Sequence, residues 1–148
     1  MVQAIYKQGE YPVISKKNLG KDMYDLTIAA REIAALSSAG QFVHIKIYGF
    51  QLRRPISICE IDRQEGTIRI VFEVRGEGTR ELSKLNEGQM LDLLGPLGRG
   101  FTILPPDRKI VVVGGGIVVP PMYELARHSG SNATAIIGFR TANAVVLE

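Results

Sequence analysis

Apolar and polar residues alternate along three segments within the first hundred residues of the chain. These segments are "MYDLTIAA" (residues 23–30), "FVHIKIY" (42–48) and "TIRIVFEV" (67–74). In the second segment, Val43, Ile45 and Ile47 face away from His44 and Lys46. A period of two is typical of strands that bury one face in an antiparallel sheet. Because turn residues separate the segments (38–40, 63–66 and 86–88), we predict a small closed barrel.

A short helix is predicted within this region, over residues 79–85. Thr79 is the expected N-cap, because a threonine hydroxyl can accept a hydrogen bond from the backbone of the first turn. Leu82 and Leu85 are expected to point inward.

The pattern changes after "PPD" (105–107), which we interpret as a hinge between two domains, 1–104 and 105–148. The apolar run "KIVVVGGG" (109–116) is typical of a buried strand in a parallel sheet. Pro120 and Pro121 suit the first turn of a helix, and Gly130 suits its end. Since "ATAIIGF" (133–139) is a second apolar strand, a β–turn–α–β unit is predicted.

Composition argues against several classes of protein and of site. The net charge of +3 is mild and the basic residues are scattered, which gives little support for nucleic-acid binding. No apolar run approaches the ~20 residues that span a bilayer, and no signal peptide is evident, so we expect a cytoplasmic protein without membrane contact. The single cysteine excludes an internal disulfide, and it excludes a cysteine-ligated iron–sulfur site built from these 148 residues alone.

No acid, base or nucleophile stands out as a catalytic group. His44 lies on the polar face of a predicted strand, and His128 lies in the last turn of a predicted helix, where a positive charge suits the helix dipole. Cys59 is expected to be a small core residue. We therefore predict no catalytic residue and no metal ligand.

The run "VVVGGGIVVPP" (111–121) matches only part of a dinucleotide-binding fingerprint. That fingerprint is G-x-G-x-x-G, with an acidic residue about 20 positions later. Gly114 and Gly116 fit the first two glycines, but Val119 occupies the third position and no Asp or Glu stands at the end of the second strand. The run is equally compatible with a tight turn and with a pyrophosphate cradle of backbone N–H groups.

Two further motifs have phosphate-binding chemistry. In "VRGEGTREL" (74–82), Gly76, Gly78 and Thr79 bring unhindered backbone to a helix start, where the dipole favours phosphate. In "LRRPISI" (52–58), the planar guanidinium of Arg54 can bind a phosphate, and Ser57 offers a hydroxyl on the same face. Each motif alone also fits a simpler interpretation, namely an ordinary N-capped loop or an arginine at the rim of a barrel.

The order of these motifs resembles that of the ferredoxin-reductase-like flavoproteins, and most closely that of the electron-transfer subunits of type B dihydroorotate dehydrogenase. The matching segments are "GQFVHIKI", "RRPISI", "GEGTREL", "GPLGRGF" and "VVVGGGIVVPPMYELA". The resemblance implies an all-β antiparallel Greek-key barrel that binds FAD, followed by the start of an α/β, Rossmann-like NAD-binding domain.

By similarity, Arg54, Gly78 and Thr79 are assigned to the FAD pyrophosphate, and Ser57 to the reactive edge of the isoalloxazine. Residues 71–73 are assigned to the adenosine or ribityl side. The complete FAD-binding set lies on two strands and one loop: Arg54, Pro55, Ile56, Ser57, Val71, Phe72, Glu73, Gly78 and Thr79. The floor of the NAD(H) site is assigned to Gly114, Gly115 and Gly116.

The resemblance also implies a function in pyrimidine biosynthesis. In that family, NADH reduces FAD by hydride transfer, and electrons leave singly through a [2Fe–2S] cluster. They reach a partner, the FMN-containing catalytic subunit, within a heterotetramer. The cofactors supply the chemistry, and the protein supplies position and electrostatics.

Two departures from the family pattern shape what we expect of this chain. Val118 stands where the family has a glycine or another small residue, which argues against close approach of a nicotinamide nucleotide. The cysteine cluster for [2Fe–2S] and the later strands of the NAD domain are absent from these 148 residues. We therefore expect a C-terminally truncated chain that binds FAD but does not by itself reduce a cluster.

Two alternatives remain open from the sequence. One is a related subunit of an NADH-dependent ferredoxin:NADP or sulfide dehydrogenase complex. The other is a non-catalytic barrel that binds a partner protein and no flavin. The presence of bound FAD separates the second alternative from the flavoprotein interpretation.

Overall fold

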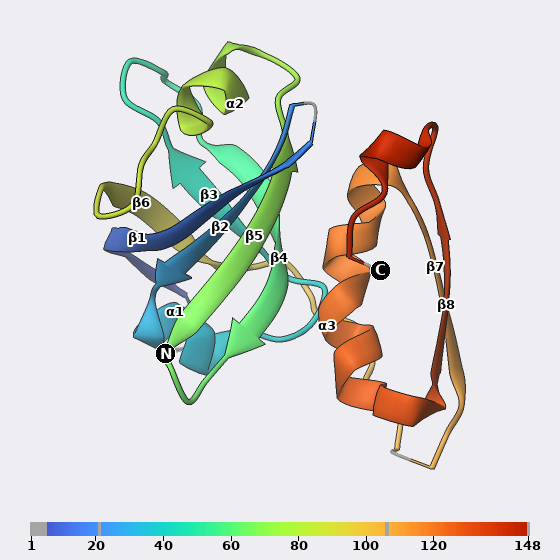
Figure 1. The fold of residues 1–148 in the computed structure, drawn as a ribbon. Coiled ribbons are helices and arrows are strands. Elements are labelled where there is room, and N and C mark those ends of the chain that lie inside the picture. Colours follow the sequence, from blue (N-terminus) through green and yellow to red (C-terminus); the bar gives the residue numbers. More distant parts are fainter. Residues whose placement is uncertain (1–5, 21, 106, 148) are drawn as a thin grey trace.

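The computed structural model describes residues 6–20, 22–105 and 107–147. Six strands close into a barrel in the order β1-β2-β5-β4-β3-β6, and every neighbouring pair is antiparallel. Strands β3, β4 and β5 are consecutive neighbours and β2 lies beside β5, which is the expected Greek-key arrangement (Figure 1). The strands are β1 (Lys7–Gly20), β2 (Met23–Ala29), β3 (Phe42–Lys46), β4 (Arg54–Asp62), β5 (Thr67–Glu73) and β6 (Met90–Leu97).

The interior of the barrel is filled by the apolar residues of the alternating segments. Val43 and Ile45 of β3 point inward, as predicted, and so do Ile68 and Ile70 of β5. Helix α1 (Arg31–Leu36), which the sequence pattern did not predict, packs Ile33 into the same core. At six residues, α1 is too short to show a clear helical period.

The second short helix, α2, begins earlier than predicted. It spans Glu77–Leu82, so the prediction of Thr79 as N-cap is wrong. Gly76 is the N-cap, and Thr79 is the third helical residue, whose hydroxyl accepts a hydrogen bond from the Gly76 N–H at 3.2 Å. This is the reciprocal half of a capping box. Leu82 is buried as predicted, while Leu85 lies beyond the helix and packs partly buried against the core.

The remaining residues, 107–147, form what we call the C-terminal unit. Its strands β7 (Ile110–Gly115) and β8 (Ala133–Gly138) pair in parallel, and helix α3 (Val119–Ser129) connects them, which confirms the β–turn–α–β prediction. Pro120 and Pro121 lie in the first turn of α3, and Gly130 ends it with a φ of 53°. Three 3₁₀ turns complete the unit: η1 (Gly116–Val118), η2 (Gly130–Asn132) and η3 (Ala142–Ala144). Of the predicted hinge, Pro106 lies outside the described residues.

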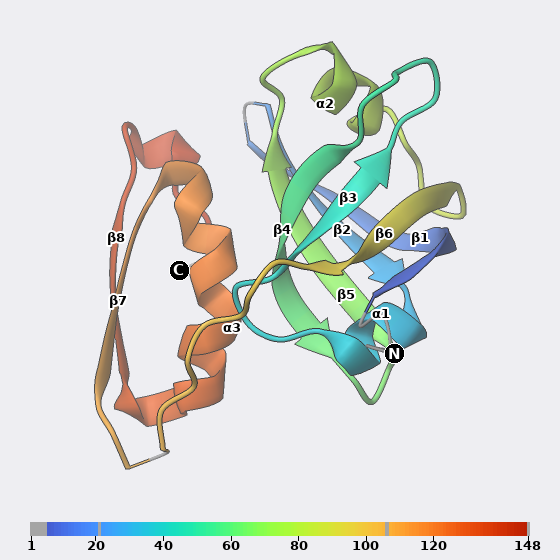
Figure 2. The ribbon, with the colours of Figure 1, turned by 180° about the vertical axis from the view of Figure 1, so that it is seen from behind.

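The β7–β8 sheet is covered on one face only. Helix α3 lies between this sheet and the barrel (Figures 1 and 2). On the other face, 62% of Val111 and 66% of Val113 are exposed, and Ile136 is exposed as well. The prediction of a fully buried strand is therefore wrong for the described residues, because no described element covers this face.

The barrel is also covered on part of its outer surface. Met23, Cys59 and Val71 point outward from β2, β4 and β5, yet they are buried with Val146 in a second apolar cluster. Tyr123 of α3 packs against this cluster. The three strands are therefore buried on both faces where the C-terminal unit contacts them. No helix in the described part of the chain is long and apolar enough to span a membrane.

Candidate functional site

A cavity of about 480 Å³ lies between the barrel and the C-terminal unit. The barrel contributes residues from the start of β4 and the end of β5, and the C-terminal unit contributes η1 and the first turn of α3. Seven of the predicted FAD-binding residues line this cavity: Pro55, Ile56, Ser57, Val71, Phe72, Glu73 and Thr79. The other lining residues are Arg75, Ile117, Val118 and Pro121.

Strand pairing explains why residues from two separate segments meet in this cavity. β4 and β5 are antiparallel neighbours, with Ile58 opposite Ile70. The start of β4 therefore lies beside the end of β5. On its other edge, β4 is held by β3, where Phe42 pairs with Ser57. Ser57 is thus held at the cavity wall by its pairing with β3, one residue before the pairing of β4 with β5 begins.

Arg54 and Gly78 are in direct contact, although they come from different motifs. A Cβ atom at position 78 would overlap the guanidinium of Arg54, so the side chain of Arg54 occupies space that only glycine leaves open. Arg54 also donates a hydrogen bond from Nη1 to the Leu52 carbonyl at 2.7 Å, and its guanidinium lies 5.3 Å from the centre of the Phe50 ring. These contacts fix the orientation of Arg54 beside the start of α2.

Arg75 lines the cavity and was not among the predicted site residues. Its guanidinium forms an ion pair with Glu73 at 2.8 Å. Its backbone N–H donates to the Thr79 hydroxyl at 2.9 Å. The sequence signal was available, because Arg75 directly precedes the "GEGT" loop. The charged side chains that line the cavity are therefore an ion pair, Arg75 with Glu73, and Arg54 lies outside the lining.

The three glycines predicted for an NAD(H) site do not themselves line the cavity. Gly114 packs closely against α3, since a Cβ atom there would lie 3.3 Å from the Val119 Cα, and Gly116 has a positive φ of 54°. These features are those of a tight strand-to-helix turn. The residues that follow them, Ile117, Val118 and Pro121, reach the cavity instead.

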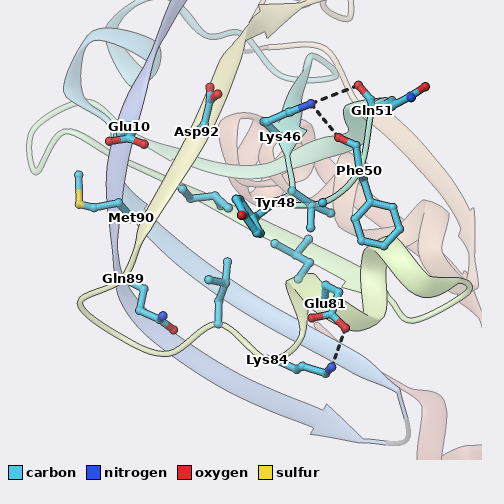
Figure 3. Close-up of a pocket in the computed structure, with 15 residues that line it drawn as sticks. Glu10, Lys46, Tyr48, Phe50, Gln51, Glu81, Lys84, Gln89, Met90 and Asp92 are labelled. Carbon is cyan, nitrogen blue, oxygen red and sulfur yellow. Dashed lines mark hydrogen bonds and ion pairs between the residues drawn. The ribbon is translucent and has the colours of Figure 1, made fainter.

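A larger cavity of about 740 Å³ is lined by residues of β1, β3, α2, β6 and the loops beside them, and none of the predicted site residues line it (Figure 3). Several of its charged side chains contact other protein groups. The Lys46 amine donates to the Phe50 and Gln51 carbonyls at 2.7 and 3.3 Å. Lys84 binds Glu81 at 2.6 Å, and Asp92 accepts two hydrogen bonds from Arg53 at 2.9 Å. We therefore take the smaller cavity as the candidate site.

Neither the candidate site nor its surroundings hold a metal-ligand cluster. Within the described residues, no group of three or more His, Cys, Asp or Glu side chains is placed to bind a metal ion. The thiol of Cys59 is fully buried in the outer cluster, and burial raises its pKa to about 12. A thiol with such a pKa is not nucleophilic at neutral pH.

Comparison with curated proteins gives consistent relatives, although no family model matches the chain. The chain is 40% identical over 144 residues to "Dihydroorotate dehydrogenase B (NAD(+)), electron transfer subunit" of Geobacillus thermodenitrificans. A protein of the same name from Bacillus cereus is 37% identical. Both alignments cover 92% of this chain and 56% of the relative, so the chain spans about half the length of the curated relatives it matches.

Solved structures show the same fold. The structure of an NADH-dependent reduced ferredoxin-NADP oxidoreductase matches with a TM-score of 0.84 and 29% identity, covering 93% of this chain and 51% of that one. A ferredoxin reductase of carbazole 1,9a-dioxygenase matches with a TM-score of 0.80 and 21% identity, covering 96% and 45%. Together with the curated relatives, these matches confirm the predicted resemblance and the ferredoxin-reductase-like fold.

Proposed function

We propose that this chain, a homologue of the dihydroorotate dehydrogenase B electron transfer subunits, binds FAD in the cavity between the barrel and the C-terminal unit. In this proposal, residues 1–104 are the FAD-binding barrel and residues 105–148 begin an NAD-binding domain. The protein then carries electrons between NAD(H) and a partner dehydrogenase.

The observation that supports this proposal most strongly is the contact of Arg54 with Gly78. It places a fixed guanidinium beside the glycine–threonine loop. Arg54 and Gly78 do not themselves line the cavity, but their chain neighbours Pro55 and Thr79 do. A guanidinium and backbone N–H groups are the donors that a pyrophosphate requires. Arg75 also lines the cavity, and Glu73 balances its charge. We assign the FAD pyrophosphate to Arg54, Gly78 and Thr79.

We propose that the rest of the cavity holds the isoalloxazine ring, because its lining is largely apolar. Its walls include Ile56, Val71 and Phe72 from the barrel, with Ile117 and Val118 from the C-terminal unit. Small-molecule sites are typically apolar and have a few polar groups that orient the ligand. The Ser57 hydroxyl is the polar group that we assign to the reactive edge of the isoalloxazine. Bound FAD supplies hydride acceptance and single-electron release, and the protein residues exclude water and fix the ring.

The nicotinamide nucleotide is assigned to the C-terminal unit. The turn formed by Gly114, Gly115 and Gly116 is its proposed floor. The half-exposed side chain of Val118 lines the proposed FAD cavity, so it takes up space between this cavity and the proposed nucleotide site. We propose that Val118 limits how closely the nicotinamide approaches the flavin.

The relatives' name supplies the proposed partner. We propose that the partner is the FMN-containing catalytic subunit of dihydroorotate dehydrogenase, in a cytoplasmic heterotetramer that acts in pyrimidine biosynthesis. The [2Fe–2S] cluster of the complete enzyme is not assigned to any residue of this chain.

The test is the flavin content of the purified chain. We expect a yellow protein with flavin absorbance, from which denaturation releases FAD in a 1:1 ratio to the chain. A colourless protein that FAD does not reconstitute would contradict the proposal and favour a partner-binding barrel.

A second candidate is a subunit of an NADH-dependent ferredoxin:NADP oxidoreductase. The TM-score of 0.84 with the structure of such an enzyme favours this second candidate. Binding partners distinguish the two candidates. Co-purification with an FMN-containing, dihydroorotate-oxidising subunit supports the first, and co-purification with a ferredoxin:NADP oxidoreductase subunit supports the second.

A further inference from the structure

Helix α3 attaches to the barrel through an ion pair that binds the backbone of one strand. The Glu124 carboxylate accepts a hydrogen bond from the Ile61 N–H at 3.0 Å. Arg127, one turn later, donates to the Ile61 carbonyl at 2.9 Å and to both oxygens of Glu124 at 2.9 and 3.1 Å. We call Glu124 and Arg127 the edge clamp, because together they satisfy both backbone groups of one residue.

The edge clamp takes the place of a neighbouring strand. β3 pairs with β4 only up to Ser57, and the Ile58 N–H then donates to the Gln41 carbonyl at 3.0 Å. Past this point, no described strand pairs with that edge of β4. A free edge has backbone donors and acceptors that need partners. The edge clamp provides these partners from a helix of the C-terminal unit.

Because the Glu124 carboxylate is buried, the contact allows only one placement of α3 along β4. The Glu124 side chain is only 8% exposed, and its hydrogen bonds also raise the pKa of the Arg127 guanidinium. A buried carboxylate is unfavourable unless its partners keep their geometry, so ion pairs of this kind specify an arrangement more than they add stability. Any sliding of α3 along β4 would leave Glu124 buried without the Ile61 N–H.

A second polar contact supports the same placement of α3. The Arg69 guanidinium of β5 lies 5.7 Å from the centre of the Tyr123 ring. Arg69 is itself held by Asp25 at 2.6 Å and by Glu60 at 3.1 Å. Tyr123 and Glu124 are neighbours on α3, and they contact Arg69 on β5 and the Ile61 backbone on β4.

The strand and the helix that the edge clamp joins also form opposite walls of the candidate site. Ser57 lies four residues before Ile61, about 13 Å along an extended strand. Pro121 lies three residues before Glu124, about 4.5 Å along the helix axis. Because both elements are rigid over such distances, a shift at the edge clamp changes the separation of the two cavity walls.

We propose that Glu124 and Arg127 are positioning residues that set the width of the cavity between the barrel and the C-terminal unit. Through this width they fix how the nicotinamide nucleotide faces the flavin, a role that rests on the proposed function. Neither residue lines the cavity, so neither is a catalytic residue.

The experiment measures the separation directly, without a cofactor. Spin labels are attached to cysteines at two exposed positions, Tyr48→Cys on the barrel and Val113→Cys on β7. Both changes are made in a Cys59→Ala background. We expect Glu124→Gln to broaden or lengthen the distance distribution, and amide exchange at Ile61 to accelerate on the order of tenfold or more. Arg127→Gln is the second variant, since Arg127 is 47% exposed and its loss is compatible with folding.

The matched control is Glu81→Gln. Glu81 also forms an ion pair three residues apart on a helix, with Lys84, but it lies on α2, away from the C-terminal unit. This control is expected to leave the distance distribution unchanged. Unchanged distances and unchanged Ile61 exchange in both clamp variants would overturn the proposal.

A flavin measurement separates this proposal from the proposed function. With FAD bound, we expect the clamp variants to keep FAD affinity within about twofold and to make the flavin more accessible to iodide quenching. Altered distances in a chain that never binds FAD would support the edge clamp as a spacer and contradict the proposed function. Normal FAD binding with unaltered distances would support the proposed function and overturn the role of the edge clamp as a spacer.

Discussion

The barrel and the C-terminal unit differ in how they bury apolar surface. The barrel closes on itself, and residues from all six of its strands point into one core. The C-terminal unit has a two-stranded sheet with a helix on one face and exposed valines on the other. A sheet of two strands has little stability of its own. The C-terminal unit therefore depends on the barrel, through the outer cluster and the edge clamp.

The same difference appears in the candidate site. The barrel provides every charged side chain that lines the cavity, and the C-terminal unit provides only Ile117, Val118 and Pro121. Charge-assisted hydrogen bonds are the stronger contacts to a phosphate. We therefore expect FAD affinity to depend on the barrel, and the C-terminal unit to affect the second substrate.

The largest expected effect comes from shortening one side chain to alanine in each of the two sheets. Ile70→Ala removes a fully buried side chain from the barrel core and is expected to lower the free energy of unfolding by about 2–5 kcal/mol. Val113→Ala, on the exposed face of β7, is expected to change it by less than about 1 kcal/mol. Urea unfolding followed by circular dichroism measures both. Similar losses in the two variants would show that a partner covers the valine face in solution.

A second comparison concerns cofactor affinity. Arg54→Ala is expected to weaken FAD binding by on the order of 1.5–3 kcal/mol, because a charge-assisted contact is lost. The matched change in the C-terminal unit is Gly115→Ala, where a Cβ atom would meet only the Gly138 carbonyl at an ordinary 3.7 Å. This variant is expected to keep the FAD affinity. Titration of the apoprotein with FAD measures both, and an unaffected Arg54→Ala would place the pyrophosphate elsewhere.

The last comparison depends on pH and concerns Cys59, which lies where the two regions meet. Its pKa is raised to about 12 in the folded protein, so the folded state keeps a proton that the unfolded state loses. The resulting stability is fully present below the unfolded pKa of about 8.5 and is lost as the pH rises toward 12. We expect the free energy of unfolding to fall by at most about 1.4 kcal/mol per pH unit in this range because of Cys59.

Cys59→Ala provides the reference for this measurement. The difference in unfolding free energy between wild type and the variant, followed from pH 8 upward, isolates the thiol from the other groups that titrate in this range. A difference that does not change with pH would mean that Cys59 is already accessible, and hence that the C-terminal unit does not stay docked.

Much of the site was predictable because it depends on local sequence. The alternation of apolar residues identified the strand that carries Phe72, and the motif "LRRPISI" identified the strand start with Ile56 and Ser57; these residues line one cavity. Arg75 was missed although it directly precedes the "GEGT" loop, because the phosphate-binding argument rested on the glycines and Thr79 alone. Thr79 was assigned the wrong position in its helix because glycine and threonine are both good N-caps, and only the backbone conformation distinguishes them.

The sequence by itself determined the barrel strands β2, β3, β4 and β5, the β–α–β unit and the motifs of the site, since these follow from the period of apolar residues and from glycine and proline placement. Only the tertiary structure decided that Arg54 meets Gly78 and that Glu124 binds Ile61. Such contacts join residues that are distant in the chain. Their formation depends on how whole elements pack, and no local pattern encodes that packing.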